Sequence, residues 1–337
     1  MSRWRSPLGA TFVLAVVLLA GVSGWLLTDP ATSRADALRT GGLAGGAVVA
    51  LYALWLNDRR RKVEENRQQV ERARYELEQL RAERDRDRVT DERFAKSVEL
   101  LGNEADQVRV GALHALVGLA RGRSDYTQTV LDILCAYLRM PSTMDDRERQ
   151  VRNTAQRLLT ELLPPAGDGP DYDLDLTGAD LRYFDPSGRR IGTLVMRDAQ
   201  LHESTNFSDC EFTGPAWLTR ATAHGRFRCE NAKFGKRAWF SGTTFAGPAE
   251  FTGTTFAGEA NFKNAVFSDD ALLGATFVNA LDLYETRFDG RVDLSSVRPS
   301  DTVSLYNTLV YSTRIELPEH WTTELADEHT RIIDRRS

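Results

Sequence analysis

Five histidines and three cysteines are the residues of this chain best suited to bind a metal ion or to act as a nucleophile. The histidines are scattered, and His114 has no His, Cys or carboxylate partner at metal-ligand spacing. The cysteines form no CxxC pair and no regular disulfide framework, so we expect reduced thiols, with Cys135 packed in a core. The full set is His114, His202, His224, His320, His329, Cys135, Cys210 and Cys229.

Known catalytic and metal-binding motifs are also missing from the sequence. The segment "DYDLD" (Asp171–Asp175) resembles the start of a calcium loop, but Leu176 stands where glycine is required and Arg182 where the final glutamate belongs. There is no Walker-type phosphate loop, no GxSxG motif and no HExxH motif. The sequence therefore predicts a protein that is not an enzyme and that has no cofactor and no metal site.

Trp217 and Trp239 are the candidate binding residues. They occupy equivalent positions two units apart in the repeat described below, and each directly precedes an apolar position of that repeat. We expect them to stack side by side on the outside of the fold and to contact a protein partner, because tryptophan is enriched at binding hot spots. The alternative is that another part of the chain, or a neighbouring subunit, covers them.

A periodic pattern of phenylalanine must position these tryptophans. In "TTFAGPAEFTGTTFAGEANFKNAVF" (Thr243–Phe267), phenylalanine recurs at alternating steps of six and five residues. An amphipathic helix would need steps of three or four, and a strand would need steps of two. A small residue precedes most of the large ones by two positions. Ten tandem units of about eleven residues indicate a solenoid in which each unit buries its apolar face on the next.

This pattern resembles the pentapeptide-repeat family, in an eleven-residue variant of the repeat. The stretch "LDLTGADLRYF" (Leu174–Phe184) is closest to that family's A(D/N)Lxx signature. The resemblance implies a right-handed quadrilateral β-helix over residues 173–310. Each step of five or six residues corresponds to one side of the coil, and we interpret the sixth residue of every second side as a bulge at a corner. We also expect "DPSGRRIG" (Asp185–Gly192) to loop out of the first coil.

Each proposed coil consists of two such units, about 22 residues in all, so residues one coil apart should stack up one side. This register places eleven phenylalanines inside the solenoid, where each should contribute about 1.5–3 kcal/mol of burial energy. The predicted structural ladder contains Phe207, Phe212, Phe234, Phe240, Phe245, Phe251, Phe256, Phe262, Phe267, Phe277 and Phe288. Phe227 stands at a position that elsewhere holds alanine, and it can fill space beside Ala223 and Cys229.

Two apolar spans predict a transmembrane hairpin within residues 1–57. Residues 8–27 and 40–56 are uncharged and long enough to approach the thickness of a bilayer core, which is about 30 Å. A cleaved signal peptide is the alternative for the first span, but it would not explain the second. The flanking arginines predict a multi-pass protein of the cell membrane with both termini in the cytoplasm. Gly41/Gly45 and Gly42/Gly46 are either helix-packing pairs or ordinary membrane-helix glycines.

The segments between the membrane and the solenoid have helical character. Residues 58–93 are highly charged, and apolar residues recur there at heptad spacing, which predicts a stalk or coiled coil that joins copies of the chain. The alternative is a lone, salt-bridged helix that continues the second apolar span. Residues 94–163 predict a compact helical module, weakly HEAT-like, and residues 164–172 a linker. Residues 311–337 should form a cap helix and tail. The heptad positions are Val63, Asn66, Val70, Ala73, Leu77 and Leu80.

These features favour a membrane-anchored scaffold whose rigid solenoid binds an unidentified protein at the cytoplasmic membrane face. The alternative is a DNA mimic, because some members of the family bind type II topoisomerases in that way. A mimic needs a strongly acidic solenoid, whereas Asp171–Thr308 holds 19 Asp and Glu against 14 Lys and Arg. The expected partners are the lipid bilayer, a protein and a second copy of the chain, and no nucleic acid is expected because the basic footprint is absent.

Overall fold

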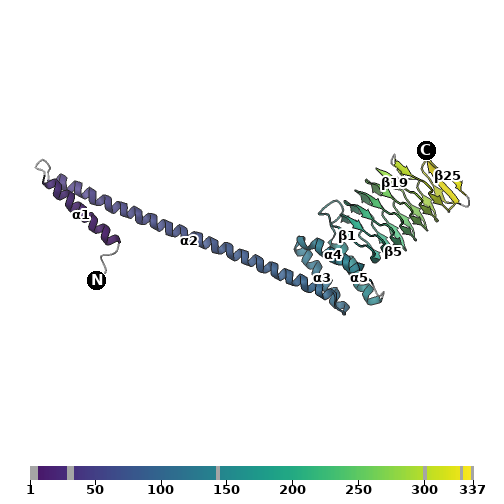
Figure 1. Cartoon of the computed structure of the whole chain (residues 1–337), viewed down its shortest axis with the longest axis horizontal. Coiled ribbons are helices and arrows are strands. Elements are labelled where there is room, and N and C mark those ends of the chain that lie inside the picture. The colour runs from purple at the N-terminus through teal and green to yellow at the C-terminus, as the bar shows by residue number, and fades with distance from the viewer. Residues whose placement is uncertain (1–6, 29–33, 142–144, 299–301, 327–328, 335–337) are drawn as a thin grey trace. The chain divides into compact units, whose positions relative to one another are not determined.

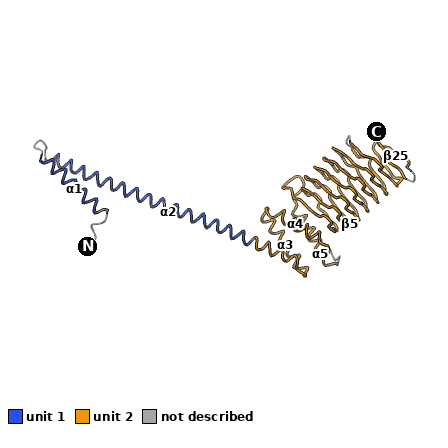
Figure 2. The backbone as a smooth tube through the Cα atoms, viewed as in Figure 1, with its two compact units in different colours: residues 1–89 blue, residues 90–337 orange. Residues whose placement is uncertain are grey.

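The computed structural model describes residues 7–28, 34–141, 145–298, 302–326 and 329–334. The chain divides into two compact units, Met1–Val89 and Thr90–Ser337, which are coloured separately in Figure 2. Helices occupy the first unit and the beginning of the second, and short strands follow from Leu174 onward (Figure 1). The predicted order of helices followed by a β-solenoid is confirmed.

The first unit contains two helices that pack against each other. α1 spans Pro7–Leu27, and α2 spans Arg34–Leu101, with its last turns in the second unit. α1 and the early part of α2 are long and apolar enough to cross a membrane. A Cβ atom at Gly41 would overlap Ser23, and one at Gly45 would lie 3.2 Å from the carbonyl oxygen of Ala15. These two glycines therefore permit close helix contact, while Gly42 and Gly46 face open space.

α2 continues without a break through the charged segment in which we predicted a stalk. Val70, Leu77 and Leu80 are about half exposed in the single chain. The side chains of Val63 and Asn66 lie outside the described residues. Association of chains through this heptad stretch therefore stays a prediction.

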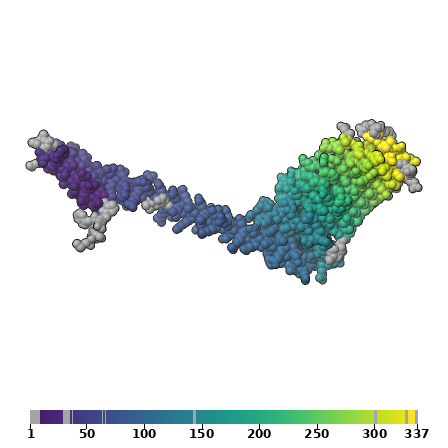
Figure 3. Space-filling model, viewed as in Figure 1, coloured from purple at the N-terminus to yellow at the C-terminus, as the bar shows by residue number. Residues whose placement is uncertain are grey.

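Three helices form the helical module that was predicted for residues 94–163. They are α3 (Asp106–Gly122), α4 (Thr127–Arg139) and α5 (Asp146–Leu162), and the short helix η2 (Ser124–Tyr126) precedes α4. Their facing sides bury a core that contains Leu113, Leu116, Leu134, Leu138 and Leu159. This core is continuous with the interior of the solenoid. Figure 3 accordingly shows the module and the coils as one packed body, from blue through teal to yellow.

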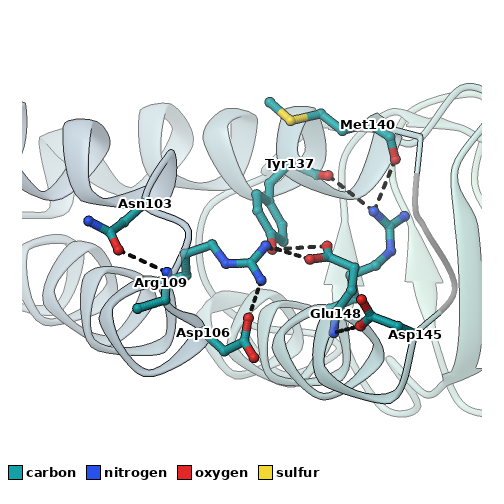
Figure 4. Close-up of polar contacts among 9 residues, drawn as sticks. Asn103, Asp106, Arg109, Tyr137, Met140, Asp145 and Glu148 are labelled. Carbon is teal, nitrogen blue, oxygen red and sulfur yellow. Dashed lines mark hydrogen bonds and ion pairs between the residues drawn. The ribbon is translucent and has the colours of Figure 1, made fainter.

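A buried polar network holds the three helices of the module together (Figure 4). The Arg109 guanidinium from α3 donates to the carboxylates of Asp106 and Glu148 and, at 3.2 Å, to the Tyr137 hydroxyl. Tyr137 in turn donates to Glu148 at 3.1 Å. Burial raises the pKa of Tyr137 to about 12, which keeps this phenol protonated as a donor. Asp145 caps α5 by accepting the Glu148 amide at 2.7 Å.

The strands of the solenoid form three sheets that run up four sides of the coil. The first sheet contains β1 (Leu174–Asp175), β4 (Leu194–Val195), β7 (Ala216–Trp217), β11 (Ala238–Trp239), β15 (Ala260–Asn261), β19 (Ala280–Asp282) and β22 (Thr302–Ser304). The second contains β3 (Arg190–Ile191), β6 (Glu211–Phe212), β10 (Lys233–Phe234), β14 (Thr255–Phe256) and β18 (Thr276–Phe277).

The third sheet forms the two remaining sides. One side contains β2 (Asp180–Phe184), β5 (Gln200–Asn206), β8 (Thr222–Ala223), β12 (Thr244–Phe245), β16 (Val266–Phe267), β20 (Arg287–Phe288) and β23 (Leu309–Val310). The other contains β9 (Arg226–Arg228), β13 (Ala249–Glu250), β17 (Ala271–Leu272), β21 (Val292–Asp293) and β24 (Ile315–Glu316). The hairpin of β25 (Trp321–Ala326) and β26 (His329–Asp334) extends the first of these two sides beyond β23.

The register between coils follows the predicted period. Phe212 pairs with Phe234, and Phe234 pairs with Phe256, each one full coil further along, in parallel strands. Phe256 then pairs with Phe277, so this coil is shorter by a single residue. The shorter coil reflects the ten-residue unit that begins at Val266. Because the register is constant, equivalent residues of successive coils lie directly above one another, and the large residues form continuous columns.

The interior of the solenoid combines aromatic columns with small residues. All eleven predicted ladder phenylalanines are at most 4% exposed. Phe234 and Phe256 stack at 4.8 Å between ring centroids, as do Phe240 and Phe262. Phe227 occupies an alanine position, pairs in register with Ala249 and is fully buried. Its ring centroid lies 5.1 Å from that of Phe245. Phe245 occupies the position that Ala223 holds one coil earlier, so the Phe227 ring fills part of the space that the small Ala223 leaves.

Glycine is required at the corner that precedes β13, where successive coils approach closely. A Cβ atom on Gly247 would lie 2.7 Å from the carbonyl carbon and oxygen of Gly225. Gly225 itself has no room for a Cβ atom, which would overlap the carbonyl oxygen of Glu203. The bulge that we predicted at such corners is therefore a tight backbone stack that excludes side chains.

Gly247→Ala is expected to lower the free energy of unfolding by about 1–3 kcal/mol, because the added methyl group presses on backbone that cannot move aside. Urea denaturation of the full chain measures this difference. Gly118→Ala is the matched control, since Gly118 faces open space on α3 and alanine there should be neutral or stabilising by up to about 1 kcal/mol. Equal midpoints for the two variants would contradict the steric argument.

The helical module closes the first coil by supplying hydrogen bonds that a preceding coil would otherwise make. The Gln128 side chain accepts from the Asp173 amide and donates to its carbonyl oxygen, both at 2.9 Å. Gln156 accepts from the Arg182 amide at 3.2 Å. Arg152, which is 5% exposed, donates to the Asp180 carbonyl oxygen at 3.2 Å. The module thus covers the end of the solenoid that begins at β1.

The far end of the solenoid is closed by a hairpin, so the predicted cap helix at 311–337 is wrong. β26 pairs antiparallel with β23, and β25 pairs with β26. Trp321 and Ile332 are buried at 3% and 0% exposure. The open edge of β23 offers backbone partners that a helix cannot use, and the β-branched residues of this segment favour a strand. Residues 335–337 lie outside the described residues.

The segment Asp185–Gly192, which we expected to loop out, remains within the first coil. Arg190 and Ile191 pair with Glu211 and Phe212 in the same register as the coils above. Ile191 is fully buried and continues the phenylalanine column of that side. The prediction failed because isoleucine replaces phenylalanine here, and the aromatic pattern was the signal used.

Candidate functional site

Trp217 and Trp239 stack on the outside of the first sheet. Their strands β7 and β11 pair in parallel register, Trp217 opposite Trp239. The preceding residues Ala216 and Ala238 point inward and are fully buried, so strand alternation directs the indoles outward. The ring centroids are 5.2 Å apart and the planes differ by 6°. Both side chains are partly exposed.

Two arginines lie over these indoles. The guanidinium carbon of Arg197 is 5.4 Å from the Trp217 ring centroid, and that of Arg237 is 5.9 Å from the Trp239 centroid. Each cation is attracted by the negative face of its ring. Since Trp217 and Trp239 also cover one another, the indole edges are the parts best placed to contact a partner.

The surface around the indoles is locally basic. We define the tryptophan face as the outward surface of four equivalent segments, 192–199, 214–221, 236–243 and 258–265. These segments contain five cations and two carboxylates, in a chain whose net charge is −5. Arg220 pairs with Asp198 at 2.7 Å and Arg237 with Glu259 at 3.3 Å, so both carboxylates are engaged. Arg197, Lys236 and Lys263 form no ion pair with any described residue.

A second stack, formed by His202 and His224, was missed by the sequence analysis. Their ring centroids are 4.6 Å apart and the planes differ by 5°. His202 lies 3.3 Å from an Asp180 carboxylate oxygen, and His224 contacts Gln200 at 2.8 Å. The signal was present, because the two histidines are separated by one coil of the repeat, as the tryptophans are. Within the described residues there is no cluster of three His, Cys, Asp or Glu side chains suited to a metal ion.

Burial lowers the pKa of His202, and the neighbouring His224 and Arg182 add to this effect, while Asp180 and Glu203 oppose it. A histidine whose pKa is lower in the folded state favours folding when it is neutral. Its contribution to stability is therefore complete above the ordinary pKa of about 6.5 and is lost as the pH falls through the lower, folded-state pKa.

The free energy of unfolding of His202→Gln should accordingly fall less than that of the unchanged chain between pH 7.5 and pH 5.5. Urea denaturation followed by tryptophan fluorescence at both pH values gives the two differences. His114→Gln, which replaces an exposed histidine on α3, removes one histidine elsewhere and should behave as the unchanged chain. If His202→Gln shows the same pH dependence as His114→Gln, His202 is not the group responsible.

A third stack consists of Tyr284 and Tyr306, with centroids 5.0 Å apart. The Lys263 ammonium lies 4.5 Å from the Tyr284 ring centroid. Unlike the tryptophan face, the coil segment 279–286 around Tyr284 carries two carboxylates and no cation. The pair therefore provides an aromatic stack of similar geometry in an acidic setting.

The remaining candidates from the sequence have structural surroundings. In the "DYDLD" segment, Asp171 pairs with Arg190 at 2.8 Å, the Asp173 carboxylate accepts the Thr193 amide at 2.6 Å, and Asp175 pairs with Arg139. Burial raises the pKa of Cys135 and Cys210 to about 12 and raises that of Cys229 as well. At neutral pH these three residues are therefore thiols rather than reactive thiolates.

The fold and its surface define a class of protein: a capped, four-sided β-solenoid that presents stacked side chains at fixed spacing. Residues 207–298 match the family model of pentapeptide repeats in three overlapping segments, 207–255, 229–273 and 251–298. With the repeating coil, this match identifies the chain as a pentapeptide-repeat protein. Comparison with curated proteins found no match, and neither did comparison with solved structures.

Proposed function

We propose that this chain is a non-enzymatic scaffold that is anchored in the cell membrane and that binds a protein partner through its solenoid. The observation that carries the proposal is the outward tryptophan stack on a rigid surface, with the rings held at 5.2 Å by paired strands. Rigid, preorganised aromatic residues bind at a low entropic cost, and Trp and Arg dominate interface energetics. The proposed orientation has both termini in the cytoplasm.

Membrane anchoring is supported by the apolar character of α1 and of the early part of α2. Aromatic residues stand near the end of the second apolar stretch and a basic residue follows it: Tyr52 and Trp55 stack at 5.8 Å, and Arg59 lies 5.3 Å from the Trp55 ring centroid. Such residues are typical of a membrane–water interface. Resistance of the chain to alkaline carbonate extraction would test the anchor, and protease accessibility of tags on both termini would test the orientation.

Cross-linking in the membranes of expressing cells tests the scaffold function. Proteins captured by the unchanged chain would be compared with those captured by Trp217→Ala/Trp239→Ala and by the control Tyr284→Ala/Tyr306→Ala. We expect the same partner with the unchanged chain and the tyrosine control, and at least about tenfold less with the tryptophan variant. Equal capture by all three would remove the tryptophan stack from the proposal.

The DNA-mimic alternative gains no support from the charges of the tryptophan face. The tryptophan face carries more cations than carboxylates, whereas imitation of a nucleic acid requires a continuous negative surface. Inhibition of a type II topoisomerase by the full chain would revive this alternative.

A further inference from the structure

The three unpaired cations of the tryptophan face suggest the chemistry of its partner. Arg197 and Lys263 occupy equivalent positions, two residues after Val195 and Asn261 of strands β4 and β15. The Trp217–Trp239 stack lies in the two coils between them. The face therefore has an aromatic centre with a cation beyond each end, and both carboxylates of the face are already engaged by Arg220 and Arg237.

We propose that this face binds an acidic segment of a partner protein in an extended conformation, parallel to the axis of the solenoid. The inference rests on the proposed scaffold function and deepens it. Arg197 and Lys263 are three coils apart, which corresponds to about 14 Å at the spacing of paired strands. An extended chain advances about 3.3 Å per residue, so carboxylates at positions i and i+4 match this span. The residue at i+2 points the same way and contacts the indole edges.

The same geometry disfavours a single-stranded nucleic acid as the occupant. Binding of bases depends on exposed ring faces on which they stack. Here Arg197 lies over Trp217, and Trp217 and Trp239 cover one another at a 6° interplanar angle. The available indole edges suit an apolar side chain better than the face of a base.

A designed peptide tests the inference with the full chain in detergent. The fluorescent probe is a nine-residue peptide with Glu at its third and seventh positions, Leu at its fifth and Ser elsewhere. Its controls carry Gln in place of both Glu residues, or place the two Glu residues only two positions apart. We expect the probe to bind at least about tenfold more tightly than either control, and its affinity to fall between 50 and 300 mM NaCl.

Three variants locate the binding. Trp217→Ala/Trp239→Ala and Arg197→Gln/Lys263→Gln should each weaken probe binding at least about tenfold. Tyr306→Ala, which keeps Tyr284 and its contact with Lys263, should leave probe binding unchanged. The arginine–lysine variant keeps both indoles, so it tests the charges even if the tryptophan variant is destabilised, and thermal melting of each variant identifies loss of fold.

Equal binding of the Glu and Gln peptides, or equal affinity in all variants, would overturn the inference. Preferential binding of a twelve-residue oligothymidine or of vesicles containing phosphatidylglycerol would overturn it too, as would self-association of the chain that depends on the tryptophans. If peptide binding fails while tryptophan-dependent capture in membranes persists, only the acidic partner is refuted. If both fail, the scaffold function is refuted as well.

Discussion

Phe240→Ala is expected to lower the free energy of unfolding by about 3–5 kcal/mol, because it removes a large ring from a closely packed interior. Phe240 is fully buried. Its ring stacks on Phe262 at 4.8 Å and meets Phe251 edge-on at 5.6 Å. It also contacts Phe234 at 6.1 Å. The coils above and below fix the positions of these neighbours, so the cavity cannot collapse readily.

Urea denaturation of the full chain, followed by circular dichroism at a β-sheet wavelength, measures this loss. Tyr306→Ala removes an aromatic ring that is 67% exposed and should cost less than about 1 kcal/mol. Phe240→Leu should fall between the two, since it retains most of the apolar volume. A Phe240→Ala midpoint close to that of Tyr306→Ala would mean that the aromatic column does not hold the coils together.

Arg152→Ala is expected to cost about 3 kcal/mol, because it removes a buried donor that four backbone carbonyl oxygens share. The guanidinium donates to the carbonyl oxygens of Met140 at 3.0 Å, Tyr137 at 3.4 Å and Leu138, which end α4, and to Asp180 in β2. One side chain therefore stabilises the end of a helix and links the module to the first coil. Removing it should loosen that coil selectively.

Hydrogen exchange provides the decisive measurement for Arg152→Ala. Protection of backbone amides in β1 and β2 should fall by more than that of amides in β10 and β14. Arg149→Ala is the control, since Arg149 lies on the same helix and forms a surface ion pair with Asp146 at 2.8 Å, an interaction worth about 0–1 kcal/mol. Uniform loss of protection along the solenoid would show that Arg152 does not act locally.

The fold of the solenoid was predictable because its period is encoded locally and repeated many times. The phenylalanines recur at equivalent inward positions in many units, so the register can still be recognised where one unit, such as that starting at Val266, is a residue shorter. The ends were harder to predict. Segment 317–333 has spacing compatible with a helix, but the open edge of β23 decides its structure, and that edge exists only once the coils have formed.

The side-chain hydrogen bonds that link the helical module to the first coil could not be predicted from the sequence either. Gln128 and Asp173 are 45 residues apart, and no pattern links a glutamine on a helix to the backbone of a later strand. The Trp217–Trp239 stack was predicted from the one-coil spacing alone. The same spacing relates His202 to His224 and Tyr284 to Tyr306, so a search for identical residues one coil apart would have found all three stacks.

The two ends of the solenoid are closed by different structures, helices before β1 and a hairpin after β23, while the coils between them contact only their neighbours. Insertion or removal of one complete coil in the middle would therefore leave both closures intact. Such a change moves the tryptophan face along the axis in increments of about 4.8 Å. The number of copies of one short segment would thus set the distance of the tryptophan face from either closure, with no change in the chemistry of the face.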